Sequence, residues 1–239
     1  MNEKERKSGI ILSTMDYQEN HKIIYLLTPN GKINLLAQRS KNIKKAVNDT
    51  QNLTKVSFIS KDKSLAKAQS LEALDYYFEI KNDIKKFAVA SYVLELIFRY
   101  VNTDLESKRL YMMVDAFLEK LKIRDDLQNL LLQLRIKMLF FLGIQPDFRL
   151  CVHCGKTENL VGLSINSYGM ECENHRSNDN IGPTATEIIR RLYLDKTFSV
   201  IIEEKQVLDY LSEFVEKYYD KHFHEVLKSV VMLKELDIY

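Results

Sequence analysis

The three cysteines of the chain all lie in one short window that a histidine closes. Cys151 and Cys154 form a C-x2-C pair, and Cys172 and His175 form a C-x2-H pair, with seventeen residues between the two pairs. Thiolates and an imidazole at this spacing sit on two tight turns that each offer two ligands to one tetrahedral cation. The pattern therefore predicts a structural zinc site, with one zinc per chain. Because four protein ligands leave no open position for a substrate, we expect the metal to hold a fold together rather than to take part in a reaction.

A second histidine stands inside the first pair and is an alternative ligand. His153 lies between Cys151 and Cys154, where coordination together with both flanking thiolates is awkward. The sequence therefore favours His175 as the fourth ligand and keeps His153 as the alternative.

Motifs of several enzyme classes are missing from the sequence. Its seven glycines form neither G-x-x-x-x-G-K-[ST] nor G-x-G-x-x-G, and there is no H-E-x-x-H. The residues just before Cys151 contain no H-x-E, which a zinc deaminase needs. His222 and His224 lie two residues apart in a helical pattern and so point to different sides. The sequence therefore predicts a protein that is not an enzyme.

Composition and charge describe a globular protein with one basic region. Hydrophobic residues make up 46% of the 239 residues, which is enough for ordinary cores. The net charge is only +2, but residues 20–70 contain ten Lys or Arg against two Asp or Glu. No apolar run reaches the length of a membrane span, and the charged residues 1–7 do not resemble a secretion signal. We therefore expect a cytoplasmic protein with no membrane partner.

The basic region coincides with the part of the chain that has strand signals. Five short segments rich in Ile, Val, Leu, Phe and Thr are separated by polar breaks, at residues 8–12, 22–27, 32–38, 53–60 and 65–74. The turn Pro29-Asn30-Gly31 joins the second and third as a hairpin, with Gly31 free to adopt a positive φ. Five strands in about 75 residues predict a small closed barrel such as an OB-fold.

After residue 75 the apolar residues follow a helical period. The pattern predicts helices at 87–101, 105–122 and 127–141, a helix capped by Thr184 that runs to Tyr193, and a last helix that starts near Val207 and can continue past His222 to Leu236. Residues 163–165 and the turn 168–169 predict a small hairpin between the two ligand pairs. The expected fold class is α+β, in the order OB-fold 1–78, helical domain 79–149, zinc-binding insert 150–182 and C-terminal part of the helical domain 183–239.

Several short motifs stand along the chain in a characteristic order. They include Gly9-Ile10-Ile11-Leu12, Tyr92-Val93-Leu94-Glu95-Leu96, Leu142-Gly143-Ile144-Gln145-Pro146 and Cys151-Val152-His153-Cys154-Gly155, together with segments 16–17, 22–28, 31–33 and 37–39. In this order and spacing they resemble the bacterial recombination mediator family RecO over nearly the whole chain. Many zinc-bearing members have a second C-x2-C where this chain has Cys172 and His175, and imidazole is an ordinary zinc ligand.

The resemblance implies an N-terminal OB-fold, a helical domain, a zinc-binding insert and a function without catalysis. Members of the family bind single- and double-stranded DNA and anneal complementary strands. With RecR they help to load RecA onto DNA coated by single-stranded DNA-binding protein (SSB), and the C-terminal tail of SSB is a further partner. The resemblance therefore implies a role in DNA repair and homologous recombination at the nucleoid.

Basic residues of the predicted barrel are the candidates for DNA contact. A single surface lysine is usually only solvated, but a cluster can follow a phosphate backbone. The candidates are Arg39, Lys41, Lys44, Lys45, Lys22, Lys32, Lys55, Lys61 and Lys63. Tyr17, Tyr25 and Phe58 are weaker candidates for base stacking, because an aromatic residue in a strand is more often core. The alternative function is a zinc-containing protein-interaction scaffold or transcription-type factor without DNA annealing activity.

Overall fold

The structure, a computed structural model, describes residues 6–38, 48–60, 66–102 and 106–238. Its internal contacts divide the chain into two units. Unit 1 comprises Met1–Ile123 and Leu227–Leu236, and unit 2 comprises Arg124–Val226 and Asp237–Tyr239. None of the helices in these described ranges combines the length and apolar character that crossing a bilayer requires.

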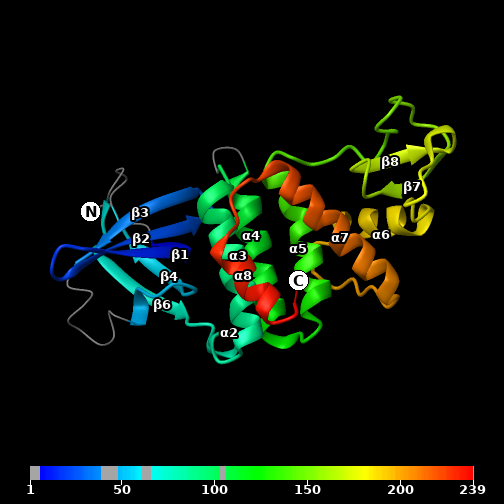
Figure 1. Cartoon of the computed structure of the whole chain (residues 1–239). Helices are drawn as coiled ribbons and strands as arrows, with labels where there is room; N and C mark the ends of the chain where they lie inside the picture. Colours follow the sequence, from blue (N-terminus) through cyan, green and yellow to red (C-terminus); the bar gives the residue numbers. More distant parts are fainter. Residues whose placement is uncertain (1–5, 39–47, 61–65, 103–105, 239) are drawn as a thin grey trace. The chain divides into compact units, whose positions relative to one another are not determined.

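Unit 1 begins with a six-stranded sheet (Figure 1). Its strands are β1 (Lys7–Tyr17), β2 (His21–Thr28), β3 (Gly31–Ala37), β4 (Lys55–Ile59), β5 (Ala66–Lys67) and β6 (Ser70–Asp75). β1, β2 and β3 form an antiparallel meander, and β4 pairs with the other edge of β1. β5 then pairs parallel with β3, whereas β6 pairs antiparallel with β4.

The two residues between β5 and β6 close this sheet into a barrel. The backbone N–H of Ala68 donates to the carbonyl of Leu36 in β3 (3.1 Å), and that of Gln69 donates to the carbonyl of Ile59 in β4 (2.9 Å). The predicted OB-fold is therefore confirmed. The single strand predicted at 65–74 is divided into two, because it changes its partner from β3 to β4 at this point.

Apolar side chains from these strands fill the barrel. Its core consists of Ile11, Ile24, Leu26, Leu35, Val56 and Phe58, with Ile33 and Leu71 packed against it. Phe58 is thus a core residue and cannot stack on a base. The predicted hairpin is also confirmed, because Thr28 pairs with Gly31 and Gly31 has a φ of +117°.

In the described part of unit 1 the sheet is accompanied by the helices α2 (Phe78–Lys81), α3 (Ile84–Tyr100), α4 (Ser107–Ile123) and α8 (Lys228–Glu235). Asp83 caps α3 by accepting hydrogen bonds from the backbone N–H groups of Lys85 and Lys86. α3 packs against β1 and α8. Ion pairs join the barrel to α4, between Lys55 and Asp115 (2.7 Å) and between Lys122 and Asp75 (2.5 Å).

Unit 2 consists of α5 (Leu127–Phe141), a hairpin of β7 (Leu160–Ser164) and β8 (Gly169–Cys172), the 3-10 turn η1 (Glu173–His175), α6 (Pro183–Leu194) and α7 (Lys205–His222). The hairpin predicted between the ligand pairs is confirmed. α5 packs against both α6 and α7.

Polar residues that interrupt the apolar pattern of α5 have partners in the segment after α6. Asn129 bonds both the N–H and the carbonyl of Ile202 (2.9 and 3.3 Å). Gln133 donates to the carbonyl of Val200 (2.5 Å), and the buried amine of Lys137 donates to the carbonyl of Asp195. These side chains satisfy the backbone of a segment that forms no helix or strand.

Two predicted helix ends are wrong. Thr184 is not the cap of α6, because the helix begins at Pro183, whose missing N–H costs nothing in the first turn. The last helix does not continue past His222. The chain starts a separate helix at Lys228, where the backbone N–H groups of Lys228 and Ser229 donate to the carboxylate of Glu95. In a continuous helix these N–H groups would bond to preceding carbonyls instead.

Glu95 of α3 thus caps α8, and Glu95→Ala is expected to destabilise the protein by about 1–2 kcal/mol at pH 7. Partial burial raises the pKa of Glu95, but hydrogen bonds from Ser229 and Lys228 and the charge of Arg99 outweigh it and lower the pKa below 4.5. The stabilisation is therefore present above pH 4.5 and is lost as the pH falls through the lowered value.

Urea unfolding of wild type, Glu95→Ala and the control Glu79→Ala, which changes an exposed residue of α2, measures this effect. The difference between wild type and Glu95→Ala should shrink between pH 7 and pH 3. Equal unfolding free energies of wild type and Glu95→Ala at pH 7 would contradict the capping role.

Candidate metal centre and basic surface

The first two candidate ligands lie on a tight turn beside the β7–β8 hairpin. The N–H of Val152 donates to the carbonyl of Met170 in β8 (2.9 Å), and the N–H of Gly155 donates to the carbonyl of Cys151 (2.8 Å). Gly155 has a φ of +71°, which favours glycine, and so the turn can close directly after Cys154. Cys151 is buried and Cys154 is exposed.

The other two candidate ligands follow from the end of β8. Cys172 is the last residue of β8, and His175 is the last residue of η1. The N–H of Glu173 donates to the carbonyl of Asn159 (3.0 Å), which ties this turn to the residue preceding β7. The hairpin therefore brings the two ligand turns together.

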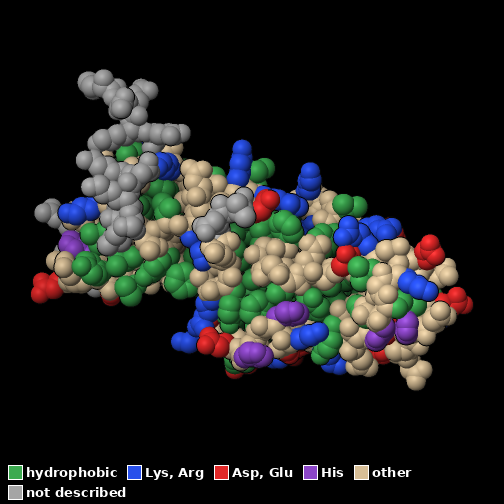
Figure 2. Space-filling model, turned by 90° about the horizontal axis from the view of Figure 1, so that it is seen from above, with side chains coloured by type: hydrophobic (Ala, Val, Ile, Leu, Met, Phe, Trp, Pro, Cys, Tyr) green, Lys and Arg blue, Asp and Glu red, His purple; other side chains and the backbone are tan. Residues whose placement is uncertain are grey.

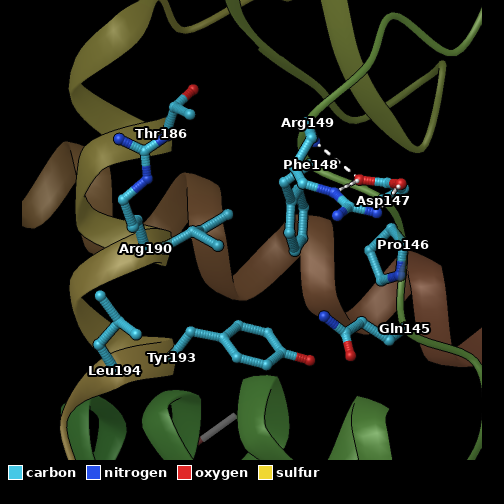
Figure 3. Close-up of a pocket in the computed structure, with 10 residues that line it drawn as sticks. Gln145, Pro146, Asp147, Phe148, Arg149, Thr186, Arg190, Tyr193 and Leu194 are labelled. Carbon is cyan, nitrogen blue, oxygen red and sulfur yellow. Dashed lines mark hydrogen bonds and ion pairs between the residues drawn. The ribbon is translucent and has the colours of Figure 1, made fainter. Parts of the chain in front are cut away.

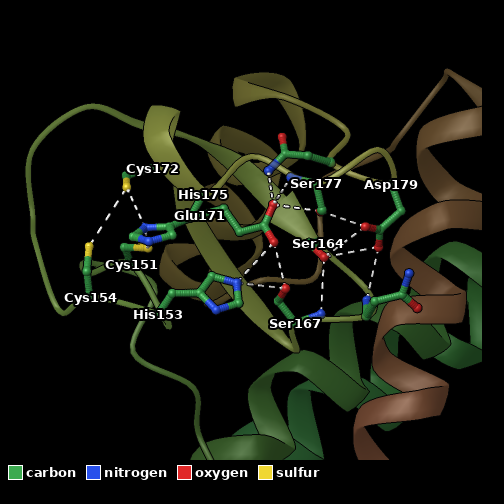
Figure 4. Close-up of polar contacts among 12 residues, drawn as sticks. Cys151, His153, Cys154, Ser164, Ser167, Glu171, Cys172, His175, Ser177 and Asp179 are labelled. Carbon is green, nitrogen blue, oxygen red and sulfur yellow. Dashed lines mark hydrogen bonds and ion pairs between the residues drawn. The ribbon is translucent and has the colours of Figure 1, made fainter.

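Four donor atoms converge at these turns (Figure 4). The Sγ atoms of Cys151, Cys154 and Cys172 and a ring nitrogen of His175 lie within 4.8 Å of one another. Cys172 Sγ lies 3.8 Å from Cys154 Sγ and 3.3 Å from His175 Nδ1, and Cys151 Sγ lies 3.7 Å from His175 Nδ1. The cluster could hold a metal ion.

His153 takes a different position. Its Nε2 lies 3.1 Å from Ser167 Oγ and 3.4 Å from a carboxylate oxygen of Glu171. Its ring is 5.3 Å from that of His175, centroid to centroid. The cluster of four donors therefore contains His175 and not His153.

Two of the thiols at this site, Cys151 and Cys172, have pKa values shifted in opposite directions. Burial raises the pKa of Cys151, but hydrogen bonding from the backbone of His153, Cys154 and Cys172 outweighs it and lowers the pKa to about 6. Burial raises the pKa of Cys172, and the neighbouring Cys151 and Cys154 raise it further. A cation beside the two sulfurs would favour the thiolate form of both.

A network of polar side chains lies next to the cluster, and the sequence pattern did not single it out. Glu171 is fully buried and accepts hydrogen bonds from Ser167 Oγ (2.6 Å), Ser177 N (2.9 Å) and Asn180 Nδ2 (3.0 Å). Burial raises the pKa of Glu171, but these bonds outweigh it and lower the pKa to about 2. The available signal was the density of Ser, Asn and Asp in residues 164–180, which also describes an ordinary loop.

The described DNA-binding candidates include two lysines with partners inside unit 1. Lys55 forms the ion pair with Asp115, and Lys32 Nζ lies 3.4 and 3.3 Å from the carbonyls of Ile97 and Phe98 at the end of α3. Lys22 is half-buried on β2. Six further candidates lie outside the described residues: Arg39, Lys41, Lys44, Lys45, Lys61 and Lys63.

The described basic side chains do not gather into one patch on the face seen in Figure 2, where they are spread over several places.

Two aromatic candidates differ in their surroundings. Tyr25 packs edge-on against Phe98 (centroids 5.0 Å apart), whereas Tyr17 is 38% exposed at the end of β1. Tyr17 is therefore the more exposed of these two aromatic candidates.

A cavity of about 580 Å³ lies in unit 2 between α6 and the segment that follows α5 (Figure 3). The rings of Phe148 and Tyr193, 6.5 Å apart, line it, with Arg149 and Arg190 at its edge. Arg149 is paired with Asp147 (2.8 Å). Arg190 lies 3.7 Å from Glu187, and so the cavity combines aromatic surface with two arginines that are each paired with a carboxylate.

Removal of either histidine separates the two assignments of the fourth ligand. His175→Ala is expected to lower the metal content of the purified protein and its affinity for the metal by at least about tenfold, because it removes one of four donors. His153→Ala is the matched control, since it removes an imidazole from the same insert and leaves the four donors in place. Elemental analysis of protein purified without chelators measures both. Metal loss in His153→Ala with retention in His175→Ala would reverse the assignment.

Comparisons with known proteins agree with this architecture. The family model for the recombination protein O N terminal matches residues 1–77, and the model for the recombination protein O C terminal matches residues 81–230. The chain is 27% identical to the DNA repair protein RecO of Bacillus pumilus over 97% of this chain and 94% of that protein. It is 26% identical to the DNA repair protein RecO of Listeria monocytogenes serotype 4a, over 98% of this chain and 95% of that protein. The chain therefore belongs to the RecO family of DNA repair proteins.

Proposed function

We propose that the protein is a noncatalytic recombination mediator that binds single- and double-stranded DNA and anneals complementary strands. Together with RecR it assists the loading of RecA onto DNA coated by SSB. The observation that carries the proposal is the order of a closed OB-fold barrel and a RecO C-terminal region within one chain. OB-folds bind single strands along a basic surface, and this part of the chain holds the excess of Lys and Arg.

The proposed DNA surface is made of the basic candidates other than Lys32 and Lys55. Lys32 and Lys55 contact helices of unit 1, and so we give them a structural role first. The segment between β3 and β4 carries Arg39, Lys41, Lys44 and Lys45, which neutralise phosphates in the proposal. Lys22, Lys61 and Lys63 extend the same surface, with Tyr17 as the stacking residue.

We further propose that the metal is a single structural zinc. Zinc bonds of about 2.3 Å to sulfur and about 2.0 Å to nitrogen in a tetrahedron put two sulfurs about 3.8 Å apart, and a sulfur and a nitrogen about 3.5 Å apart. Three of the six separations here are close to these values: 3.8 Å for Cys154 and Cys172, and 3.3 and 3.7 Å for His175 with Cys172 and Cys151, and all four donors lie within 4.8 Å of one another. This agreement and the three thiols support zinc over a cation that prefers oxygen ligands.

The proposed partners besides DNA are RecR and the C-terminal tail of SSB. An acidic peptide end needs apolar contact together with cationic groups, and the cavity beside α6 offers Phe148, Tyr193, Arg149 and Arg190. This chemistry supports the cavity as the place for the tail. With these partners, the protein acts in the cytoplasm on the DNA of the nucleoid.

DNA binding is expected to depend on salt and on the segment between β3 and β4. If four cations neutralise phosphates, the logarithm of the affinity for single-stranded DNA should fall against the logarithm of salt with a slope of about −3. The variant Arg39→Glu, Lys41→Glu, Lys44→Glu, Lys45→Glu should weaken all sequences about equally. A control variant reverses four exposed lysines elsewhere, Lys85, Lys108, Lys196 and Lys205, for the same change in net charge. Equal affinity of the two variants in a fluorescence anisotropy titration would place the DNA site elsewhere.

Annealing is expected to need no nucleotide. A basic surface can screen two strands and leave their bases available, and so binding energy alone is sufficient. Annealing of complementary oligonucleotides should therefore proceed without ATP or free magnesium, fall with the quadruple variant at residues 39–45, and persist in His222→Ala and His224→Ala. If DNA binding fails altogether, the protein-interaction scaffold is the better account. Loss of annealing in the histidine variants, with fold and DNA binding intact, would instead indicate catalysis.

A further inference from the structure

A buried carboxylate lies beside the metal cluster without belonging to it. Glu171 immediately precedes Cys172 on β8, and its side chain has no exposed surface. A carboxylate is costly to bury unless hydrogen bonds compensate for the loss of water. The partners of Glu171 therefore have to be held in place for the insert to fold.

Its hydrogen-bond donors surround the carboxylate, beside the turn that carries Cys172 and His175 (Figure 4). One oxygen accepts from Ser167 Oγ (2.6 Å), at the tip of the hairpin. The other accepts from the N–H and hydroxyl of Ser177 (2.9 and 2.8 Å) and from Asn180 Nδ2 (3.0 Å). Cys172 and His175 lie between Glu171 and Ser177, and so these bonds close a short loop around both ligands.

A second carboxylate continues the network to α7. Asp179 accepts from the hydroxyl of Ser164 (3.0 Å) and from the N–H of Asn166 (3.0 Å), and it lies 2.6 Å from the hydroxyl of Ser177, whose single proton it shares with Glu171. The hydroxyl of Tyr210 on α7 lies 2.6 Å from the carbonyl oxygen of Asp179. The loop that Glu171 closes is therefore anchored to a long helix and not only to the insert.

We propose that Glu171 is a positioning residue for the metal centre, which clamps the turn at Ser177 and so holds Cys172 and His175 in ligand geometry before the metal binds. The inference rests on the proposed zinc centre. Without the clamp, the metal would have to order this loop as it binds, and the cost of ordering would appear as weaker affinity. Ligand identity would stay the same.

The test compares Glu171→Gln with Glu173→Gln in the full chain. Glu173 is exposed and flanks Cys172 on the other side, so each variant removes one carboxylate charge next to the same ligand. Both carboxylate oxygens of Glu171 accept hydrogen bonds. In Glu171→Gln an NH2 group, which is a donor, replaces one of these two acceptors. We expect it to weaken Zn²⁺ binding about 10- to 100-fold in competition with a chromophoric chelator, and Glu173→Gln to stay within about twofold of wild type. Under limiting Co²⁺, the tetrahedral absorption bands should weaken in Glu171→Gln alone.

Hydrogen exchange of metal-free protein tests the ordering itself. The Ser177 amide should be protected in wild type and exposed in Glu171→Gln. Ser177→Ala removes the hydroxyl but keeps this N–H, so its Zn²⁺ affinity should lie between those of wild type and Glu171→Gln. It also serves as the milder variant if Glu171→Gln does not fold.

Three results would overturn the inference while leaving the zinc centre intact. They are unchanged affinity in Glu171→Gln, equal weakening by Glu171→Gln and Glu173→Gln, and an unprotected Ser177 amide in metal-free wild type. Failure of the wild type to bind Zn²⁺ would overturn the proposed zinc centre together with the inference.

Discussion

The insert between α5 and α6 is too short to build an apolar core of its own, and this constraint governs the polar chemistry of unit 2. Small segments need cross-links other than hydrophobic burial. Here they are the converging donors of Cys151, Cys154, Cys172 and His175 and the buried carboxylate of Glu171. Both kinds of link act on the same turn, because Ser177 and Asn180, which supply donors to Glu171, follow the last ligand His175 within five residues. Metal binding and backbone hydrogen bonding are therefore parts of one folding problem.

In the body of unit 2, polar side chains also hold an irregular segment in place. The segment from the end of α6 to α7 has no regular structure, yet Asn129, Gln133 and Lys137 of α5 bond its backbone groups. These residues follow one another at intervals of four, and so they share one face of the helix. A face of α5 that looks too polar for a core is thus the face that holds an irregular segment in place.

In unit 1, two of the basic residues expected to bind DNA make contacts within the fold. The excess of Lys and Arg in residues 20–70 suggests a basic surface, but Lys55 is paired with Asp115 on α4 and Lys32 lies at the carbonyl end of α3. Cations at the end of a helix and in a partly buried ion pair stabilise packing. Counting charge along a sequence therefore overstates the charge that a phosphate backbone can meet.

The sequence by itself determined the elements whose signal is local. Spacing of Cys and His selected the four-donor cluster, Pro29 and Gly31 marked the hairpin, and apolar periods located α3, α4 and α5, because each of these depends on residues close together in the chain. Only the tertiary structure decided where the strand predicted at 65–74 changes its partner. It also decided why the helix predicted to run past His222 ends there and a separate helix begins at Lys228. It also decided that Glu171 is buried beside the ligands. These features depend on the fold of a loop or on groups that lie apart in the sequence. Ala68 donates to the carbonyl of Leu36, Gln69 donates to the carbonyl of Ile59, and Ser229 donates to the carboxylate of Glu95. No local pattern records which distant donor or acceptor a backbone group will meet.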